Sequence, residues 1–371
     1  MNGPRAGTAD ALAPPAARLA MAAPRPRVAV LLGALAAALV VSLTWSITLG
    51  PADISAAAVW AIAGSELAAR LGLPVSVDAS AHHNIVWMIR LPRVLLAALV
   101  GAGLAVVGVT MQAMVRNPLA DPYLLGVSSG ASVGAVSVLA WGVLGFAGAH
   151  ALPLGAFLGA LSACLLVYLL AHANGRLLAP RLILGGVAIG CFLAGITSLI
   201  TLTAEQRELA RSVLTWLLGS LAGAQWRDLG LPALALALGI GWLRLQARAL
   251  NALLGGDETA ATLGVDTTRV RRGLFLVVSL LTGVMVAVSG AIGFIGLMIP
   301  HVARMLVGAE HRRVLPVAAL IGAIFLVWVD ALARTVFMPV EIPVGVITAL
   351  LGGPFFVWLL CRQGLPPGAG R

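Results

Sequence analysis

Long apolar runs alternate with short polar segments along almost the whole chain of 371 residues. Each run approaches the roughly 20 residues that a helix needs to cross a bilayer. The pattern predicts about ten membrane-spanning helices, at residues 28–49, 94–114, 124–144, 153–171, 182–203, 228–246, 273–290, 295–308, 314–331 and 344–361. The predicted fold class is therefore all-α, a polytopic membrane protein, because a transmembrane barrel would show short segments of alternating polarity instead.

The eighth apolar run is shorter than the others and is interrupted. Its beginning, "SGAIGFIGLMIPH", contains Gly290, Gly293, Gly296 and Pro300. Glycine and proline weaken a helix, and a membrane tolerates irregular backbone only where protein covers it. We therefore predict one broken or re-entrant segment here.

The two ends of the chain lie outside the apolar runs. Residues 1–27 are rich in Ala, Pro and Arg and predict a disordered cytoplasmic tail. Residues 362–371 predict a second, short cytoplasmic tail, and the transmembrane domain covers residues 28–361. The first run is longer than the 7–15 apolar residues of a signal peptide, so a retained helix is favoured over a cleaved leader.

Composition narrows the classes of function. Charged residues make up 10% of the chain and hydrophobic residues 60%, whereas soluble domains carry about 25% charged residues. All 24 basic residues are Arg, and without Lys the chain has no P-loop to hold nucleotide phosphates. Any ATP that drives this protein must bind to another subunit. The net charge of +10 includes no basic stripe with interleaved aromatics, so nucleic acid is not an expected partner.

The arginines predict the orientation of the helices, because cytoplasmic segments carry an excess of basic residues. With both termini inside, all but seven arginines lie on the cytoplasmic side. The exceptions are Arg70, Arg90, Arg93, Arg207, Arg211, Arg227 and Arg334. The excess predicts an N-in and C-in topology. The outer Arg90, Arg93 and Arg334 bind either lipid phosphates or an anionic partner.

Two polar segments stand out on the cytoplasmic side. In residues 251–272, a Gly-Gly pair breaks the chain before Asp257, whose charge favours a helix N-terminus, and Gly264 is expected to cap that short helix. A second short helix is expected near Asp266, and the pair is either a partner-binding element or an ordinary loop. The other segment, residues 116–122, is expected to form a tight turn, because its two prolines stop helix propagation.

Five stretches carry a resemblance to a known family. They are "RLPRVLLAALVGAGLAVVGVTMQAMVRNPLADPYLLGVSSGASVG", "WLLGSLAGAQW", "GGDETAATLGV", "SGAIGFIGLMIPHVARMLVGAEHR" and "EIPVGVITALLGGPFFVWLL". In order and spacing, from about residue 86 to 361, they resemble the permeases of bacterial type II ABC importers for ferric siderophores, haem and cobalamin.

The resemblance implies a homodimeric inner-membrane permease with ten helices per subunit and a pathway along the dimer axis. Two ABC ATPase subunits would bind ATP and Mg²⁺ in the cytoplasm, and a periplasmic binding protein would dock outside. The chain itself is then expected to be no enzyme and to bind no metal or cofactor.

The resemblance also assigns roles to residues. The segment matching the family's coupling helix, which enters a cleft of the ATPase, supplies Gly255, Asp257, Glu258, Thr259, Ala260, Leu263 and Gly264. Arg90, Arg93 and Arg334 match arginines that pair with Glu residues of the binding protein. Asn117 and Leu119 match the cytoplasmic gate, and Leu178, Ala179 and Pro180 match a second constriction, although the local sequence departs from the polar residues of some members.

The cargo is inferred more indirectly. Arg211, one turn before a Trp, resembles the haem branch of the family, and Arg207 lies on the same helical face. These arginines either meet the two propionates of haem or form surface ion pairs with the neighbouring Glu205 and Glu208. Met111 and Met114 either line a soft apolar channel or pack in the core. In the outer loop before the second span, His82 and His83 either ligate haem iron or have no specific role.

Haem is therefore the predicted cargo, with ferric siderophore and cobalamin as alternatives within the family. From another class, an ion-coupled carrier remains an alternative, but it should show carboxylates at the membrane midplane. A membrane enzyme is disfavoured, because the sequence has no Ser/His/Asp or metal-spaced cluster.

Overall fold

The computed structural model describes residues 25–50, 52, 54–73, 80–173, 176–204 and 207–362. The tails predicted at 1–27 and 362–371 lie outside these residues, apart from Arg25–Arg27 and Arg362, which belong to helices. The first helix thus begins three residues earlier than the apolar pattern indicates.

Each predicted apolar run contains a helix. They are α2 (Arg25–Thr48), α5 (Leu91–Val115), α6 (Val127–Trp141), α7 (Ala151–Ala171), α8 (Ala179–Thr203), α10 (Gly230–Leu245), α13 (Thr267–Ser289), α14 (Ile295–Val307), α15 (His311–Thr335) and α16 (Val344–Arg362). Among the described residues, seven helical stretches are long and apolar enough to cross a membrane, and α6, α14 and α16 contribute shorter apolar helices. The class of polytopic helical membrane protein is confirmed, while the number of crossings stays a prediction.

Short elements join these helices. The helices are α3 (Ala56–Arg70), α4 (Ala81–Asn84), η1 (Ile85–Arg90), η2 (Pro122–Leu125), η3 (Gly145–His150), α9 (Arg207–Leu217), η4 (Trp226–Asp228), α11 (Ala247–Leu254) and α12 (Asp257–Thr262). The two-residue strands β1 (His172–Ala173) and β2 (Arg176–Leu177) pair antiparallel.

One local prediction was wrong, and another was right about where a helix starts but not about its length. The segment with His82 and His83 is helical instead of a loop, and α4, η1 and α5 form one continuous helix, Ala81–Val115, that starts where the Ser80 hydroxyl accepts the His83 N–H. The short helix expected near Asp266 is the first turn of α13, whose N-terminus Asp266 caps by accepting the Arg269 N–H at 2.9 Å. In both places a side-chain cap extends the long helix.

Helix α5 forms the centre of the bundle, and most of its residues are buried. Small residues allow neighbouring helices to approach it closely. A side chain at Gly101 would collide with the Gly322 carbonyl of α15, and one at Gly108 would collide with the Gly296 carbonyl of α14. These two close Gly-Gly contacts therefore allow α14 and α15 to pack tightly against α5.

The chain is broken between α13 and α14, as the glycines of the eighth run predict. Gly290 and Phe294 both adopt positive φ, +67° and +69°, and α14 begins only at Ile295. Tyr123 in η2 braces the break: its hydroxyl donates to the Ile292 carbonyl at 2.9 Å and accepts the Ile292 N–H at 2.8 Å. The irregular backbone is thus satisfied inside the protein.

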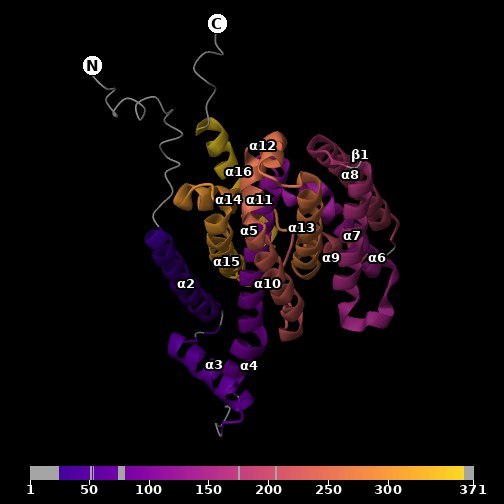
Figure 1. The fold of residues 1–371 in the computed structure, drawn as a ribbon. Helices are drawn as coiled ribbons and strands as arrows, with labels where there is room; N and C mark the ends of the chain where they lie inside the picture. The colour runs from indigo at the N-terminus through magenta and orange to yellow at the C-terminus, as the bar shows by residue number, and fades with distance from the viewer. Residues whose placement is uncertain are drawn as a thin grey trace, which may run out of the picture.

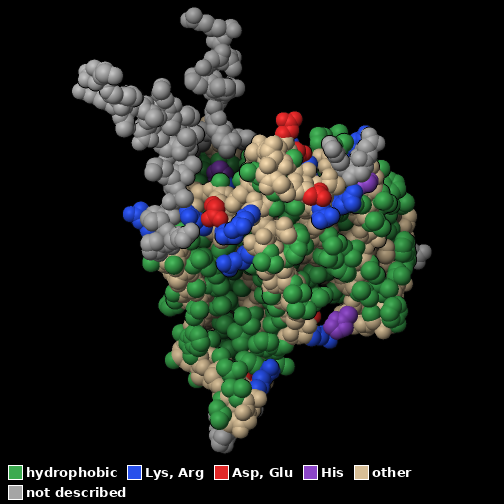
Figure 2. Space-filling model, in the orientation of Figure 1, with side chains coloured by type: hydrophobic (Ala, Val, Ile, Leu, Met, Phe, Trp, Pro, Cys, Tyr) green, Lys and Arg blue, Asp and Glu red, His purple; other side chains and the backbone are tan. Residues whose placement is uncertain are grey.

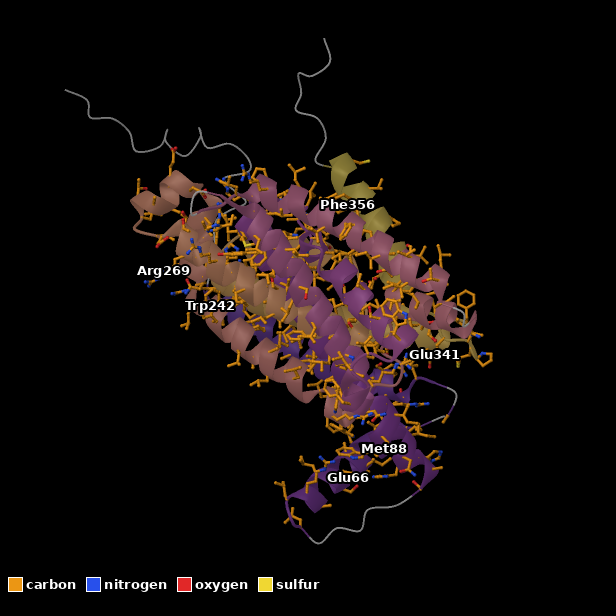
Figure 3. All side chains as sticks on the ribbon, turned by 90° about the vertical axis from the view of Figure 1, so that its right-hand side faces the viewer. Glu66, Met88, Trp242, Arg269, Glu341 and Phe356 are labelled. Atoms are coloured by element: carbon orange, nitrogen blue, oxygen red, sulfur yellow. The ribbon has the colours of Figure 1, made fainter. Side chains whose placement is uncertain are left out.

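The molecule has two distinct ends (Figure 1). Helix α12 lies at one end and helices α3 and α4 lie at the other; following the predicted orientation, we call these the inner and the outer end. The surface between them is mostly hydrophobic in Figure 2. In Figure 3, Glu66 and Met88 lie at the outer end and Arg269 lies toward the inner end.

Candidate functional site

Three arginines predicted as outer docking points gather at one place. Arg90, Arg93 and Arg334 are 5%, 7% and 8% exposed, and all line one cavity of about 300 Å³ beside Glu341. They come from η1, α5 and α15, so the fold brings together positions that are far apart in the sequence. Whether a partner contacts them stays a prediction.

Two of these arginines are neutralised within the chain. Asp330 is fully buried; its carboxylate accepts Arg93 Nε at 2.9 Å and Arg334 Nε at 3.0 Å. Arg93 also donates to Glu341 at 2.9 Å, so two guanidiniums face two carboxylates. This network depends most on Asp330, because it is the fully buried partner of both arginines and removing the partner of a buried charge is costly.

Arg90 has a different environment. Its guanidinium donates to the carbonyls of Ile47 at 2.7 Å and Ala52 at 3.1 Å, at and beyond the C-terminus of α2. Those carbonyls lack helical partners, and a cation at a helix C-terminus is favourable. No carboxylate in the described part of the chain is paired with Arg90, so it supplies the excess positive charge of the cavity.

The predicted coupling helix is present at the inner end as α12. Gly256, with φ +103°, precedes it, and Gly264, with φ +78°, follows it. Asp257 is held by Arg271 of α13 through two hydrogen bonds, at 2.8 and 3.1 Å. The break, the start and the end of the helix therefore lie where the glycines and the acidic pair indicate.

The exposed face of α12 differs in one residue from the predicted contact set. Glu258, Thr259, Leu263, Gly255 and Gly264 are exposed. Ala260 is fully buried, so its side chain packs against the chain's own core and does not face outward. The sequence predicted which residues form α12 but not which side of the helix faces outward. The Asp257–Arg271 pair fixes that orientation.

The two predicted gate segments lie beside different cavities. Asn117 accepts the Leu119 N–H at 2.9 Å, the side-chain turn expected of this segment, and Asn117 lines a cavity with Arg304. Leu178 precedes α8, where Ala179 and Pro180 form its first turn, and it lines a cavity with Asp257 and Glu258 of α12. The second segment is therefore next to α12. The gate role of both is untested.

The proposed cargo arginines lie on α9. Arg211 is exposed and lines a cavity of about 560 Å³ near the outer end; Arg207 is the first residue of α9, and its side chain lies outside the described ones. Arg227 and Asp228 line the same cavity, and their closest approach is 4.0 Å. Trp216, Leu139 and Leu152 supply apolar wall, and Ser289 and Gly290 bring in the broken segment.

Met111 and Met114 were proposed to line a channel, and the structure contradicts that alternative within this chain. Both side chains are fully buried, because α5 is surrounded by α13, α14 and α15. They pack in the core, which was the alternative interpretation.

The two histidines of the outer segment are engaged differently. His83 is mostly buried, and its Nε2 lies 2.9 Å from Glu66 Oε1 of α3, whereas His82 is exposed. Arg70 stacks over Trp87 and Trp226, with 5.0 and 5.7 Å from the guanidinium carbon to the ring centroids. These contacts hold α3 against α4, η1 and η4, and η4 contributes Arg227 and Asp228 to the cavity that Arg211 lines. No group of three or more His, Cys, Asp or Glu residues suited to a metal ion occurs among the described residues.

Sequence reasoning missed three features of this arrangement. Asp330 and Arg334 are four residues apart in a helix, a spacing that signals an ion pair, but Arg93 gives no such local signal. The Tyr123–Ile292 brace and the Glu66–His83 pair join residues 169 and 17 positions apart, which only the fold brings together.

The family model for the FecCD transport family matches residues 38–362. The hemin transport system permease protein HmuU of Yersinia pestis is 45% identical over 288 residues, covering 75% of this chain and 84% of the relative. The cobalamin import system permease protein BtuC of Halobacterium salinarum is 45% identical over 276 residues, covering 74% of this chain and 73% of the relative.

A solved structure has the same architecture. It is described as an inward-facing conformation of a metal-chelate type ABC transporter, with a TM-score of 0.77 and 31% sequence identity. The alignment covers 90% of this chain and 99% of that chain. The overall helical fold of this chain therefore recurs in that structure.

Proposed function

This chain belongs to the FecCD transport family, and we propose that the cargo it carries into the cell is haem. Membership makes the chain a permease subunit of an ABC importer, a multi-pass protein of the bacterial inner membrane and not an enzyme. Membership also decides against an ion-coupled carrier, the alternative from another class that the sequence left open. Relatives with hemin and with cobalamin in their names are equally similar, at 45% identity, so similarity does not choose between cargoes.

The observation that carries the haem proposal is the position of Arg211 in the outer cavity. A guanidinium binds a carboxylate through two parallel hydrogen bonds, and haem presents two propionate carboxylates. Arg227 in the same cavity offers a second guanidinium: it forms an ion pair with Asp228 at 4.0 Å, a distance too long for a hydrogen bond, so its N–H donors are not used by that carboxylate. The cavity volume of about 560 Å³ lies within the range of small-molecule sites.

The test is ATP-driven uptake in vesicles that contain the assembled importer and its binding protein. Haem should accumulate with ATP, and Arg211→Gln should reduce haem uptake about tenfold through loss of a charge-assisted contact. Arg248 is exposed on α11 and does not line this cavity, so Arg248→Gln is the matched control. Uptake of cobalamin or a ferric siderophore but not of haem would reject the cargo while leaving the permease role intact.

The assembly we propose has two copies of this chain, each crossing the membrane ten times with both termini inside. Two ATPase subunits bind ATP and Mg²⁺ and receive α12 through Gly255, Asp257, Glu258, Thr259, Leu263 and Gly264. Asn117 and Leu119, with Leu178, Ala179 and Pro180, form the inner gate. The exposed face of α12 and its anchoring by Arg271 support the coupling role.

The periplasmic binding protein docks, in this proposal, at the outer cavity with Arg90, Arg93 and Arg334. Arg93 and Arg334 already have carboxylate partners, so Arg90 carries most of the attraction for an acidic partner. Arg90 is buried in the cavity wall, so its charge would act on a partner through the field of the cavity, and long-range attraction of this kind mainly raises association rates. Arg90→Gln should therefore slow association with the binding protein at low salt, measured by surface plasmon resonance, and the difference should shrink at high salt. An unchanged rate would reject the docking role.

A further inference from the structure

A small cavity at the inner end concentrates positive charge without a matching acid. It has a volume of about 210 Å³ and is lined by Gln112, Ala113, Arg116, Asn117, Pro118, Leu254, Arg304, Ala309 and His311. The walls come from α5, α11, α14 and the start of α15. None of these lining residues is acidic, so Arg116 and Arg304 give the cavity a net positive charge.

Arg304 is held in the cavity wall by a neutral partner. Its guanidinium donates to the Gln112 side-chain oxygen, and the Gln112 amide in turn donates to the carbonyls of Gly296 at 3.2 Å and Leu297 at 3.4 Å. Gln112 is itself buried. A guanidinium has five N–H donors in a planar fork, so Gln112 fixes the direction of Arg304 and leaves donors for another acceptor.

The acids around this cavity are engaged elsewhere. Glu310 lies 2.9 Å from Arg313, and Asp257 is paired with Arg271. Arg116 lies beside Gly256. In the described part of the chain neither Arg116 nor Arg304 forms an ion pair with a carboxylate, and the side-chain partner of Arg304 is Gln112. Because Arg304 is only partly accessible, leaving its charge without an anion is unfavourable.

The surroundings indicate the kind of anion. Met305 and Leu306, which follow Arg304 on α14, are 61% and 51% exposed, so an apolar surface suited to lipid chains adjoins the cavity. Basic pockets between membrane helices at the cytoplasmic surface bind anionic lipid headgroups. A phosphate group also matches the guanidinium fork.

We propose that the cavity between α5, α11, α14 and α15 binds a phosphate group through Arg304 and Arg116. The phosphate comes from an anionic lipid of the cytoplasmic leaflet or from free inorganic phosphate. Its binding holds the C-terminal half of α14 against α5, next to the turn at Asn117. This site is separate from the outer cavity of the haem proposal and does not depend on it.

The test uses the purified permease–ATPase complex in detergent, with melting temperature and native mass spectrometry as readouts. Phosphatidylglycerol should remain bound and raise the melting temperature, whereas phosphatidylcholine should not. Arg304→Gln and Arg116→Asn should each weaken this binding about tenfold, as expected for loss of a charge-assisted contact. Asn at position 116 retains a residue that tolerates the left-handed backbone there, with φ of 57°.

Arg312→Gln is the matched control, because Arg312 is exposed at the same end and does not line the cavity. Inorganic phosphate, compared with chloride at equal ionic strength, identifies the source: if it raises the melting temperature as much as the lipid does, free phosphate is the ligand. The proposal is overturned if neither anion binds, or if both cavity variants bind phosphatidylglycerol as tightly as the wild type. It is also overturned if Arg312→Gln loses binding to the same extent.

Discussion

Arg93 and Asp330 form a buried ion pair, 2.9 Å from Nε to Oδ1, that joins α5 to α15 across 237 positions of sequence. Asp330 also accepts Arg334 from its own helix. The carboxylate has 0% of its surface exposed, so its charge depends on these two guanidiniums. The pair therefore holds together the outer ends of two helices on which the proposed docking cavity is built.

Replacing this carboxylate should destabilise the protein strongly. Asp330→Asn keeps the size of the side chain but leaves Arg334 buried without an ionic partner, a change that costs about 3–5 kcal/mol in comparable networks. Glu341→Gln is the matched comparison, because the Glu341 side chain is 46% exposed and Arg93 keeps Asp330 as its buried partner, so the melting temperature should fall less than in Asp330→Asn. Thermal unfolding in detergent measures both. Equal melting temperatures for the two variants would contradict the central role of Asp330.

How much of this could be predicted from sequence differs between features. The ten apolar runs each contain a helix, because a span must satisfy its own backbone and apolar length alone reveals it. The placement of Met111 and Met114 could not be predicted, since a helix that is apolar all round gives no periodic signal for core against lipid. The glycines around α12 marked its ends, but the burial of Ala260 depends on the long-range contacts of that helix.

The same limit applies to the site. Arg90, Arg93 and Arg334 stood out by their place on the outer side, the family resemblance added a docking role, and the fold brings them to one cavity. Their internal partners were not expected, because the Arg93–Asp330 contact spans most of the chain. That Arg90 binds backbone carbonyls and, among the described residues, no carboxylate follows only from the geometry at the C-terminus of α2.

The brace between Tyr123 and the broken segment can be tested by removing one oxygen. Tyr123→Phe leaves both the N–H and the carbonyl of Ile292 without this partner, and each unsatisfied buried group costs about 1–3 kcal/mol. The melting temperature should fall. Tyr168→Phe is the control, because the Tyr168 ring stacks on His172 at 5.6 Å in a contact that does not need the hydroxyl. A drop of the same size in the control would reject the brace.

Asp121 should make stability depend on pH. Burial raises the pKa of this carboxyl from its ordinary 3.8 to about 6, against the opposing hydrogen bond from the Tyr123 N–H. A raised pKa means that the folded state favours the neutral acid, so stability is fully present below about pH 4 and is lost as the pH rises through about 6. The melting temperature should thus be higher at about pH 5 than at about pH 7.5.

Asp121→Asn isolates this effect, because the amide keeps the oxygen that accepts the Tyr123 N–H at 2.7 Å and removes the titration. Its melting temperature should vary less between those two pH values than that of the wild type. An identical pH dependence in both proteins would show that another group is responsible.

The anchoring of α12 should matter for coupling more than for folding. Asp257→Asn removes the charge that Arg271 binds through two hydrogen bonds, which weakens the anchor by about 1.5–3 kcal/mol. Cargo transported per ATP hydrolysed should fall in reconstituted vesicles. Asp266→Asn, at the exposed cap of α13, should leave this ratio unchanged. If Asp257→Asn lowers transport and ATP hydrolysis in the same proportion, α12 has no specific coupling role.

The turn at Leu119 provides the test of the inner gate. Asn117 fixes the backbone of Leu119 by accepting its N–H at 2.9 Å, so the leucine side chain is held in place by the turn itself. If two copies of this turn close the pathway, Leu119→Ala shortens the plug without disturbing that hydrogen bond. Leak of preloaded cargo from vesicles without ATP should then rise, whereas Leu245→Ala, at an exposed position of α10, should not change it. A leak rate equal to the wild type would leave residues 116–122 with a purely structural role.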